Sequence, residues 1–293
     1  MILMTGATGL SGSLIVEEFA RRGVPVRALV RDPRRAGHLS ELAGVEWVQG
    51  DMLRPESLHE AFKDVERVLL ISSARERMVE TQQTFIDAAR AAGVPHVVKL
   101  SGKEAGIGFD ADRFRGTREH LDIERYLERS GVAWTHLRPS QFMQLYLPGG
   151  NFGVDPVRHE LRLPIGSTRL SPIDIEDVAK IAVAVMTSSG HEGAVYEMSG
   201  PEALSMKEVV ERVSDATGVR YSYVEVSRAE KVAEYRELGL PDVGVQILDE
   251  LLAERSRHTD SHIWLDAHRA FGVPPTSFAE FANRHAAALL GQP

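Results

Sequence analysis

The chain begins with an apolar segment, a glycine-rich turn and an amphipathic segment, and this order constrains the fold more than any other feature. Met1–Thr5 has the composition of a buried strand, and Gly6–Gly12 follows it directly. Leu10–Arg22 then carries apolar side chains at helical spacing, with Gly23 as a stop. A strand that runs through three glycines into a helix is typical of the first unit of a nucleotide-binding parallel sheet.

Each glycine of the turn has a separate physical task in such a site. Gly6 permits the tight turn, Gly9 lets the backbone approach a pyrophosphate, and Gly12 lets the helix pack closely on the strand. The first amides of the helix then present a partial positive charge to the phosphates. We therefore expect a dinucleotide at this turn, in contact with the three glycines and with Thr8 and Leu10.

The first 140 residues alternate short apolar segments with amphipathic ones, as expected for a parallel sheet with crossover helices. The expected strands are Met1–Thr5, Val26–Val30, Val45–Gln49, Val68–Ser72, His96–Ser101 and Trp134–Leu137. After the first helix, further helices are expected over Glu56–Lys63, Val79–Ala92 and Arg118–Ser130. The predicted fold is α/β, a Rossmann-type doubly wound parallel sheet.

After Pro139 this alternation ends, and the remainder predicts a smaller mixed α/β lobe. Residues 148–172 are rich in glycine and proline and predict loops with short strands. Later helices are expected over Ile175–Thr187, Met206–Thr217, residues 228–257 and Phe278–Leu290, and strands over Ala194–Met198 and Tyr221–Val226. We place an NADP-binding Rossmann domain at residues 1–147 and a substrate-binding lobe at 148–293, with residues 171–198 returning to the Rossmann domain.

The residues after the second strand bear on the choice of cofactor. An arginine there favours the 2′-phosphate of NADP, whereas a carboxylate favours the 2′-hydroxyl of NAD. The strand ends in Arg31, and Arg34 and Arg35 follow. Because a planar guanidinium binds phosphate through two hydrogen bonds, Arg31 and Arg35 favour NADPH. Asp32 leaves NAD open, and at least one of Arg34 and Arg35 could be a solvated helix-start residue.

Three other strand ends supply further candidates for cofactor binding. Asp51 and Met52 follow the third strand, where Asp51 could reach the adenine or could simply form a helix-entry turn. Ser72 and Ser73 end the fourth strand and are expected beside the cofactor. Ser101 ends the fifth strand and is expected to line the nicotinamide pocket.

The chain resembles the NmrA-like group of atypical short-chain dehydrogenases/reductases, which includes NADPH:quinone reductases and triphenylmethane dye reductases. The resemblance rests on TGATGLSG at 5–12, ALVRDP at 28–33, GDMLRPESL at 50–58, SGVAWTHLRPSQFM at 130–143, SPIDIEDVA at 171–179 and GPEALSMKEVVE at 200–211. It implies a Rossmann domain, an NADP cofactor, and a substrate cleft between the carboxyl edge of the sheet and the smaller lobe.

One feature of the larger dehydrogenase family does not match. That family carries a Tyr-x-x-x-Lys pair on the helix after the fifth strand, in which the tyrosine is the general acid. Aligned on Glu124 and on Ser130–Gly131, this chain has Gly116 at the tyrosine position and His120 at the lysine position. The resemblance therefore implies a reductase whose proton comes from another group or from solvent.

The candidate catalytic residues are His120, Ser101 and Lys103. His120 titrates near neutral pH and could hold the nicotinamide ribose or donate a proton, and Ser101 falls where the larger family has its serine. Lys99 and Lys103 flank Ser101, and a lysine could donate a proton if it were desolvated. The structural alternatives are a packed or solvated histidine and solvated lysines.

Gln141, Phe142, Met143 and Tyr146 follow the sixth strand and are candidate substrate contacts. Their apolar side chains could form a wall for a small apolar or aromatic substrate, with Gln141 as the polar contact. Ordinary core packing is the alternative for the same residues, and the sequence leaves both open.

Composition excludes several classes of partner. The net charge is -8 with scattered basic residues, so no nucleic-acid partner is expected. No apolar run approaches the roughly 18 residues of a membrane span. The absence of cysteine excludes disulfides and thiolate zinc sites, and no metal is expected. We expect a cytoplasmic protein, and a homodimer remains open.

Together these features predict an NADPH-dependent reductase that transfers hydride to a quinone, enone, imine or similar conjugated small molecule. The alternative is a non-enzymatic NADP(H)-sensing regulatory protein of the NmrA type. A third possibility is an isomerase or epimerase with tightly held NAD.

Overall fold

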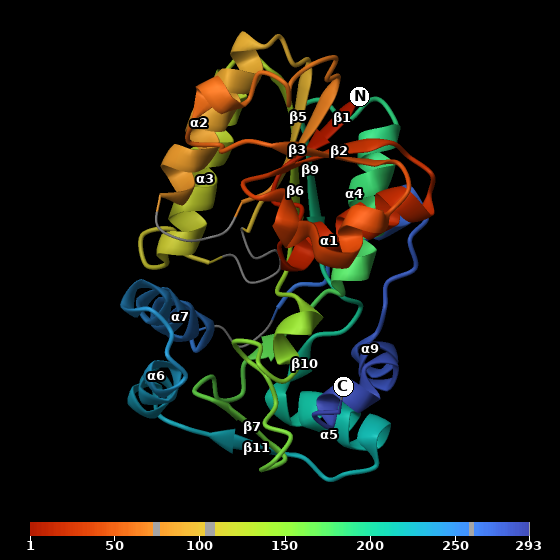
Figure 1. Cartoon of the computed structure of the whole chain (residues 1–293). Coiled ribbons are helices and arrows are strands. Elements are labelled where there is room, and N and C mark those ends of the chain that lie inside the picture. Colours follow the sequence, from red (N-terminus) through yellow and green to blue (C-terminus); the bar gives the residue numbers. More distant parts are fainter. Residues whose placement is uncertain (73–76, 103–108, 258–260, 293) are drawn as a thin grey trace. The chain divides into compact units, whose positions relative to one another are not determined.

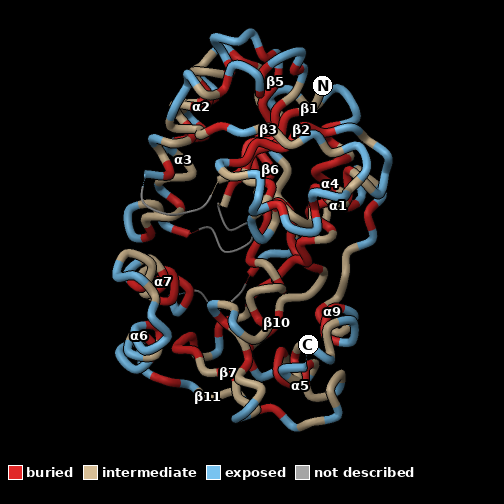
Figure 2. The backbone as a smooth tube through the Cα atoms, viewed as in Figure 1, coloured by how far each residue is buried: buried red, intermediate tan, exposed pale blue. Residues whose placement is uncertain are grey.

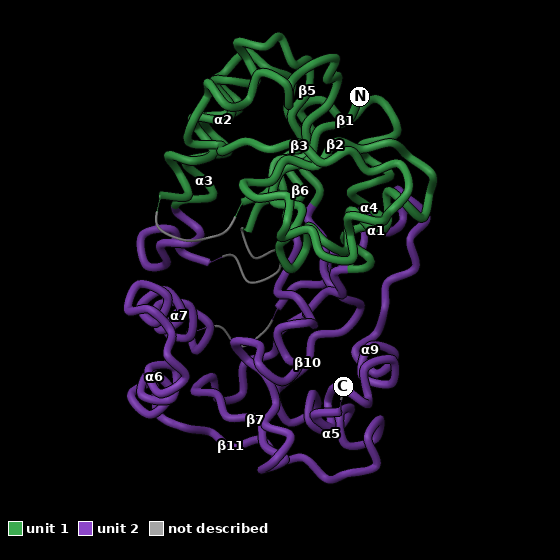
Figure 3. Tube along the Cα trace, viewed as in Figure 1, with its two compact units in different colours: residues 1–102, 119–138, 176–196 green, residues 103–118, 139–175, 197–293 purple. Residues whose placement is uncertain are grey.

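The structure is a computed structural model that describes residues 1–72, 77–102, 109–257 and 261–292. The predicted site residues Ser73 and Lys103 lie outside the described residues. The chain forms two compact units, unit 1 (residues 1–102, 119–138 and 176–196) and unit 2 (residues 103–118, 139–175 and 197–293), as Figure 3 shows. The domain boundary predicted after residue 147 stays a prediction, because compactness alone does not define an independently folding domain.

Unit 1 is built on a seven-stranded sheet with the strand order β3-β2-β1-β4-β5-β6-β9. The strands are β1 (Ile2–Met4), β2 (Val26–Val30), β3 (Val45–Gln49), β4 (Arg67–Leu70), β5 (His96–Leu100), β6 (Ala133–Pro139) and β9 (Ala194–Met198). The pairs from β3 through to β6 are parallel. Since the chain crosses from one side of β1 to the other after β3, the switch point lies between β1 and β4. This confirms the predicted doubly wound α/β fold.

Four helices cover the two faces of this sheet. They are α1 (Leu10–Arg21), α2 (Met78–Ala91), α3 (Arg115–Arg129) and α4 (Ile175–Thr187). Helices α2 and α3 lie on one face, and α1 and α4 lie on the other (Figure 1). The central strands are therefore buried, as Figure 2 shows, and Val97 of β5 belongs to the same core cluster as Phe85 of α2 and Ile123 of α3.

The segment predicted as a helix over Glu56–Lys63 is not one. The structure has only a short 3-10 helix, η2 (Pro55–Ser57), followed by turns. Leu58 and Phe62 are buried in the core of unit 1, so their burial holds the segment although it makes little more than one turn of helix. Apolar residues at helical spacing over so short a segment therefore indicate which side chains are buried, but they do not predict a stable helix.

Unit 2 contains several short helices and two small sheets. The helices are α5 (Met206–Thr217), α6 (Arg228–Glu237), α7 (Asp242–Arg255), α8 (Asp266–Phe271), α9 (Phe278–Arg284) and α10 (Ala286–Leu289), with the 3-10 helix η3 (Met143–Tyr146). The sheets pair β7 (Glu160–Leu163) with β11 (Ser222–Glu225) in parallel, and β8 (Arg169–Leu170) with β10 (Leu204–Ser205) in antiparallel. The helix predicted over Phe278–Leu290 is thus divided at His285, whose backbone leaves the helical region.

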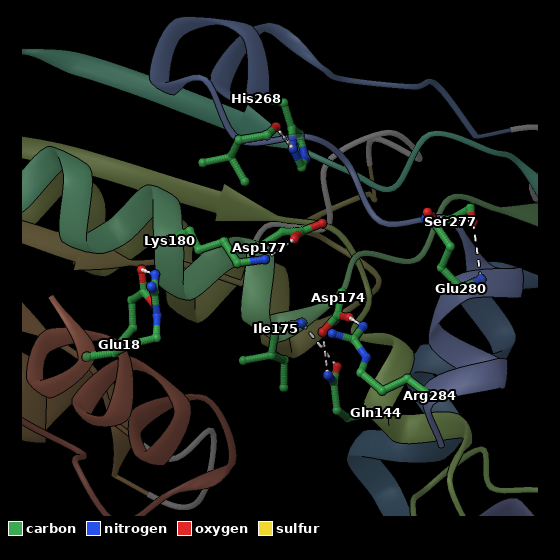
Figure 4. Close-up of polar contacts among 12 residues, drawn as sticks. Glu18, Gln144, Asp174, Ile175, Asp177, Lys180, His268, Ser277, Glu280 and Arg284 are labelled. Carbon is green, nitrogen blue, oxygen red and sulfur yellow. Dashed lines mark hydrogen bonds and ion pairs between the residues drawn. The ribbon is translucent and has the colours of Figure 1, made fainter. Parts of the chain in front are cut away.

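Local capping explains where several helices of unit 2 begin. Helices α5, α6 and α9 each start at a serine whose side chain accepts from the amide of a glutamate three residues later, while the glutamate reaches back to the serine amide. Ser277 and Glu280 of α9 form one of these pairs (Figure 4). Along the described part of the chain, no helix has the length and apolar character needed to cross a membrane.

Candidate active site

The turn after β1 is fixed against the chain that follows β4. The buried Thr5 hydroxyl donates to the Ile71 carbonyl at 2.6 Å and accepts from the Ile71 amide at 2.8 Å. Gly6 has a φ of +66°, and a Cβ at this position would lie 2.8 Å from the Ile71 carbonyl oxygen. Glycine is therefore required at residue 6 both by its backbone angle and by the lack of space.

Gly12 brings α1 against this turn. A Cβ on Gly12 would lie 2.0 Å from the Gly6 carbonyl oxygen, so the helix packs on the turn itself and not on the strand as predicted. Gly9 precedes the helix and offers no side-chain cap, and the first turn of α1 carries no acidic residue. Because the first amides of a helix lack partners within it, these residues fit the phosphates of a dinucleotide. Leu10 is about half exposed at this end of α1.

Some of the charged residues after β2 are paired with each other, and others are exposed to solvent. Asp32 caps the following 3-10 helix, η1 (Pro33–Glu41), and pairs with Arg34 at 2.8 Å. Hydrogen bonds from Arg34 lower the pKa of Asp32, which is therefore ionised and occupied. Arg31 and Arg35 are exposed, and neither side chain makes a hydrogen bond or ion pair with the described residues. Two guanidinium groups thus remain available for a phosphate.

The other predicted cofactor residues lie at the ends of β3 and β4. The Asp51 carboxylate accepts from the Leu53 amide at 3.0 Å. Asp51 therefore forms a local turn, which was the alternative to a contact with the adenine. Met52 packs against the core of unit 1. The Ser72 hydroxyl accepts from the Gln82 amide nitrogen at 2.8 Å. Their contacts with a cofactor stay predictions.

A buried polar network lies at the carboxyl end of β5. The Lys99 side chain is fully buried, and its Nζ lies 2.9 Å from Nδ1 of His120 on α3 and 3.4 Å from the Ser101 hydroxyl. Ser101 in turn donates to Glu124 of α3. Glu124 accepts from Arg138 of β6 at 3.0 Å. Two predicted catalytic residues, His120 and Ser101, are therefore brought together by a lysine between them.

The surroundings shift the protonation of this network. Burial lowers the pKa of Lys99 to about 7, although the Glu124 carboxylate opposes the shift. Burial and the nearby charge of Lys99 hold the pKa of His120 well below its usual value. Burial acts to raise the pKa of Glu124, but hydrogen bonds from Arg138 and Ser101 outweigh it and keep that pKa low. At neutral pH His120 is therefore neutral, Glu124 is ionised and Lys99 is close to its midpoint.

Gly102 sets the position of the histidine ring. A Cβ on Gly102 would lie 2.5 Å from Nε2 of His120, so the ring lies over bare backbone immediately after β5. Nδ1 faces the buried Lys99, and Nε2 lies beside Gly102, just beyond the carboxyl end of β5. One signal for Lys99 is visible in the sequence, a lysine that directly follows two valines in the strand His96–Leu100. Its desolvation could be seen only once α3 and β6 were in place.

The predicted substrate residues lie in unit 2, on the segment after β6. Gln141 is 5% exposed, and neither its amide oxygen nor its amide nitrogen has a hydrogen-bond partner among the described residues. Phe142 is half-buried and pairs with Ile173 in an isolated bridge. Met143 and Tyr146 are buried in the core of unit 2, so contact of these two with a substrate stays a prediction.

The segment that carries Gln141 is held firmly. The Gln141 carbonyl accepts from the Ile173 amide at 2.8 Å. Gln144 donates to Asp174 at 2.7 Å, and Arg284 forms an ion pair with the same carboxylate, so both side chains point toward Asp174 (Figure 4). The Gln141 amide, which has no partner among the described residues, therefore belongs to a fixed backbone, and its contact with a substrate stays a prediction.

Residues 1–262 match the NmrA-like family. The chain belongs to this family. The NmrA-like chain is 32% identical over 291 residues to an NAD(P)H azoreductase of Xenophilus azovorans, covering 99% of each. It is 34% identical over 298 residues to a (4-alkanoyl-5-oxo-2,5-dihydrofuran-3-yl)methyl phosphate reductase of Streptomyces griseus, again covering 99% of each.

Among solved structures, the NmrA-like chain is similar to an NADPH-dependent quinone oxidoreductase of Escherichia coli in complex with NADPH. The two are 27% identical with a TM-score of 0.83, and the match covers 97% of this chain and 99% of the other. Together with the family match, this confirms the resemblance inferred from the sequence.

We expect Lys99→Met to change how the stability of the NmrA-like chain depends on pH. The pKa of Lys99 is about 7 in the folded chain and close to 10.5 when unfolded, so the unfolded state binds more protons between these values. Stability of the wild type should therefore rise relative to the variant as the pH rises from about 7 to about 10. Urea unfolding of both proteins across this range measures the difference, and parallel pH profiles would contradict a desolvated lysine.

Proposed function

We propose that the protein is an NADPH-dependent reductase that transfers hydride to a small conjugated acceptor such as a quinone. The observation that carries this proposal is the uncapped glycine turn with two available arginines, at the same sheet edge as the Lys99–His120 pair. The relatives support it, because their names specify an azo compound, an oxodihydrofuran and a quinone. Each is an unsaturated acceptor whose two-electron reduction adds a hydride and a proton.

The chain's own groups would bind and orient the cofactor. The glycine turn and the first amides of α1 hold the pyrophosphate, and Arg31 and Arg35 hold the 2′-phosphate. In an open α/β sheet the ligand lies outside the carboxyl ends of the strands at the switch point, which here is the edge shared by β1, β4 and β5. When bound, the nicotinamide supplies the hydride.

His120 and Gln141 have the two remaining roles. His120 faces the carboxyl edge through Nε2 and donates the proton that the reduced acceptor requires. The buried amide of Gln141 can donate and accept at once, so it suits a carbonyl or hydroxyl of the acceptor. Ser101 positions Lys99 and Glu124 through its hydroxyl.

The alternative function is a non-enzymatic sensor of NADP(H). A sensor requires cofactor binding but no proton donor, whereas burial of a lysine beside a histidine lowers stability without aiding nucleotide binding. The buried pair therefore favours the enzyme. NADPH oxidation is the test, measured with quinones, azo dyes and enones; turnover is expected with at least one class. Binding of NADPH without turnover of any class would favour the sensor.

We expect Arg31→Ser to weaken NADPH binding by about 10- to 100-fold and to leave NADH binding unchanged, because only NADPH carries the 2′-phosphate. This range corresponds to a charged hydrogen-bonded contact of about 1.5–3 kcal/mol. Arg34→Ser is the matched control, since Arg34 is paired with Asp32 and should change neither affinity. Calorimetric titration of both dinucleotides measures the effect. Equal weakening of NADPH and NADH would contradict the role of Arg31.

We expect Gln141→Leu to raise KM for the acceptor about 10-fold while raising the free energy of unfolding by about 1 kcal/mol, because it removes a buried amide that has no partner in the described part of the chain. Gln144→Leu is the matched control. Its amide is paired with Asp174, so this substitution should lower stability. Steady-state kinetics and urea unfolding measure the two effects. A destabilised Gln141→Leu protein with unchanged KM would show that Gln141 is structural.

A further inference from the structure

The Lys99–His120 pair is arranged as a path from the interior of unit 1 to its sheet edge. Lys99 projects from β5 toward α3 and has no exposed surface. Its Nζ contacts one ring nitrogen of His120, and the other ring nitrogen lies over Gly102, just beyond the end of β5. The imidazole is therefore placed between a buried proton source and the edge where the rule for open sheets places the ligand.

The charges around Lys99 define which ring nitrogen carries the proton. Glu124 and Arg138 face the lysine and neutralise each other, and His136 of β6 lies near enough to be affected by its charge. A protonated lysine has hydrogens and no acceptor, so it donates to the unprotonated Nδ1 of a neutral His120. Nε2 then carries the hydrogen and is a donor at the sheet edge.

Resting on the proposed reductase function, we propose that Lys99 and His120 form a proton relay that delivers one proton per turnover to the acceptor. The acceptor takes hydride and becomes an anion. Nε2 of His120 gives its proton to that anion, and Nδ1 takes a proton from the Lys99 ammonium. The histidine ends neutral with its hydrogen on Nδ1, and the lysine ends as an amine. After the product leaves, Nε2 takes a proton from solvent and Nδ1 returns its proton to the Lys99 amine, which restores both groups. One proton is thereby consumed with each hydride.

The remaining polar neighbours hold this path in place. Ser101 accepts from Lys99 and donates to Glu124, so its hydroxyl orients the ammonium without taking its proton. The ion pair with Arg138 fixes the position of the Glu124 carboxylate beside the lysine. The bare backbone of Gly102 leaves room for the histidine ring. Lys99 is thus a positioning and relay residue, and His120 is the group that meets the acceptor.

Comparing two acceptors, one that needs a proton and one that does not, shows whether Lys99 acts in a proton relay or only in the structure. Reduction of a quinone adds a hydride and a proton, whereas a cationic triphenylmethane dye becomes neutral by taking a hydride alone. We expect Lys99→Met to slow NADPH-dependent quinone reduction about 100-fold, the typical lower effect of losing a general acid, and to change dye reduction less than about 2-fold. NADPH affinity should not change, because Lys99 holds no part of the cofactor.

The pH profile with the quinone alone gives a second readout. Because the relay needs a protonated lysine, wild-type quinone reduction should fall as the pH rises above about 7, and this fall should be missing from Lys99→Met. Gly102→Ala is a second variant that keeps the lysine but displaces the histidine ring, and it should show the same loss for the quinone only. Lys180→Met is the control, since Lys180 is a partly exposed lysine paired with Asp177.

The outcomes distinguish the relay from the function on which it rests. Equal losses with both acceptors, or an unchanged pH profile in Lys99→Met, would overturn the relay and leave the reductase in place. A wild-type protein that binds NADPH but reduces neither acceptor would overturn the reductase function, and the relay with it. Selective loss with the quinone, together with loss of the alkaline fall, would establish the relay.

Discussion

The contact between Gly12 and the Gly6 carbonyl is the constraint on which the arrangement of the site depends. A Cβ on Gly12 would lie 2.0 Å from that oxygen, so α1 can begin where it does only with glycine at this position. The contact sets the first amides of α1 at the carboxyl edge of the sheet. Arg31 and Ser101 reach the same edge because their strands run parallel to β1 or to its neighbours. A single backbone approach thereby gathers the cofactor residues.

The positive charges at this edge differ in how much hydration they lose in the folded protein. Arg31 and Arg35 are exposed, so an unpaired guanidinium is hydrated and costs little stability until a phosphate arrives. Lys99 is fully buried, where an ammonium loses its hydration and is retained only with polar neighbours such as Ser101 and His120. Exposed cations suit binding of a charged cofactor, and a desolvated lysine suits proton transfer near neutral pH.

Much of the fold could be predicted from the sequence, because its elements have strong local patterns. The bounds of β2, β3, β9, α4 and α5 agree with the predicted ranges. The start of α1 at Leu10 was also predicted, from the glycine turn that precedes it. The helix expected over Glu56–Lys63 was wrong, since apolar spacing in so short a segment also arises from burial of turns. Local sequence could not separate these two cases.

The site could be predicted only in part. Strand ends identified Arg31 and Ser101, because parallel strands bring their carboxyl ends to one edge. His120 lies on α3 and was identified by its place at the lysine position of the larger family's Tyr-x-x-x-Lys pair. A lysine can donate a proton near neutral pH only if it is desolvated, and Lys99 meets this condition. Its desolvation depends on packing against α3 and β6, which lie far from Lys99 in the sequence. Likewise the sequence predicted Gln141 as a substrate contact, but that its amide has no partner within the described ranges is a property of the folded backbone.

Hydrogen–deuterium exchange of the glycine turn tests the central claim most directly, because its backbone amides are the groups proposed to hold the cofactor phosphates. With saturating NADPH, exchange in peptides that cover residues 5–13 should slow markedly, and peptides from α5 should be unaffected. Unchanged exchange at residues 5–13, in protein shown to have NADPH bound, would contradict the account.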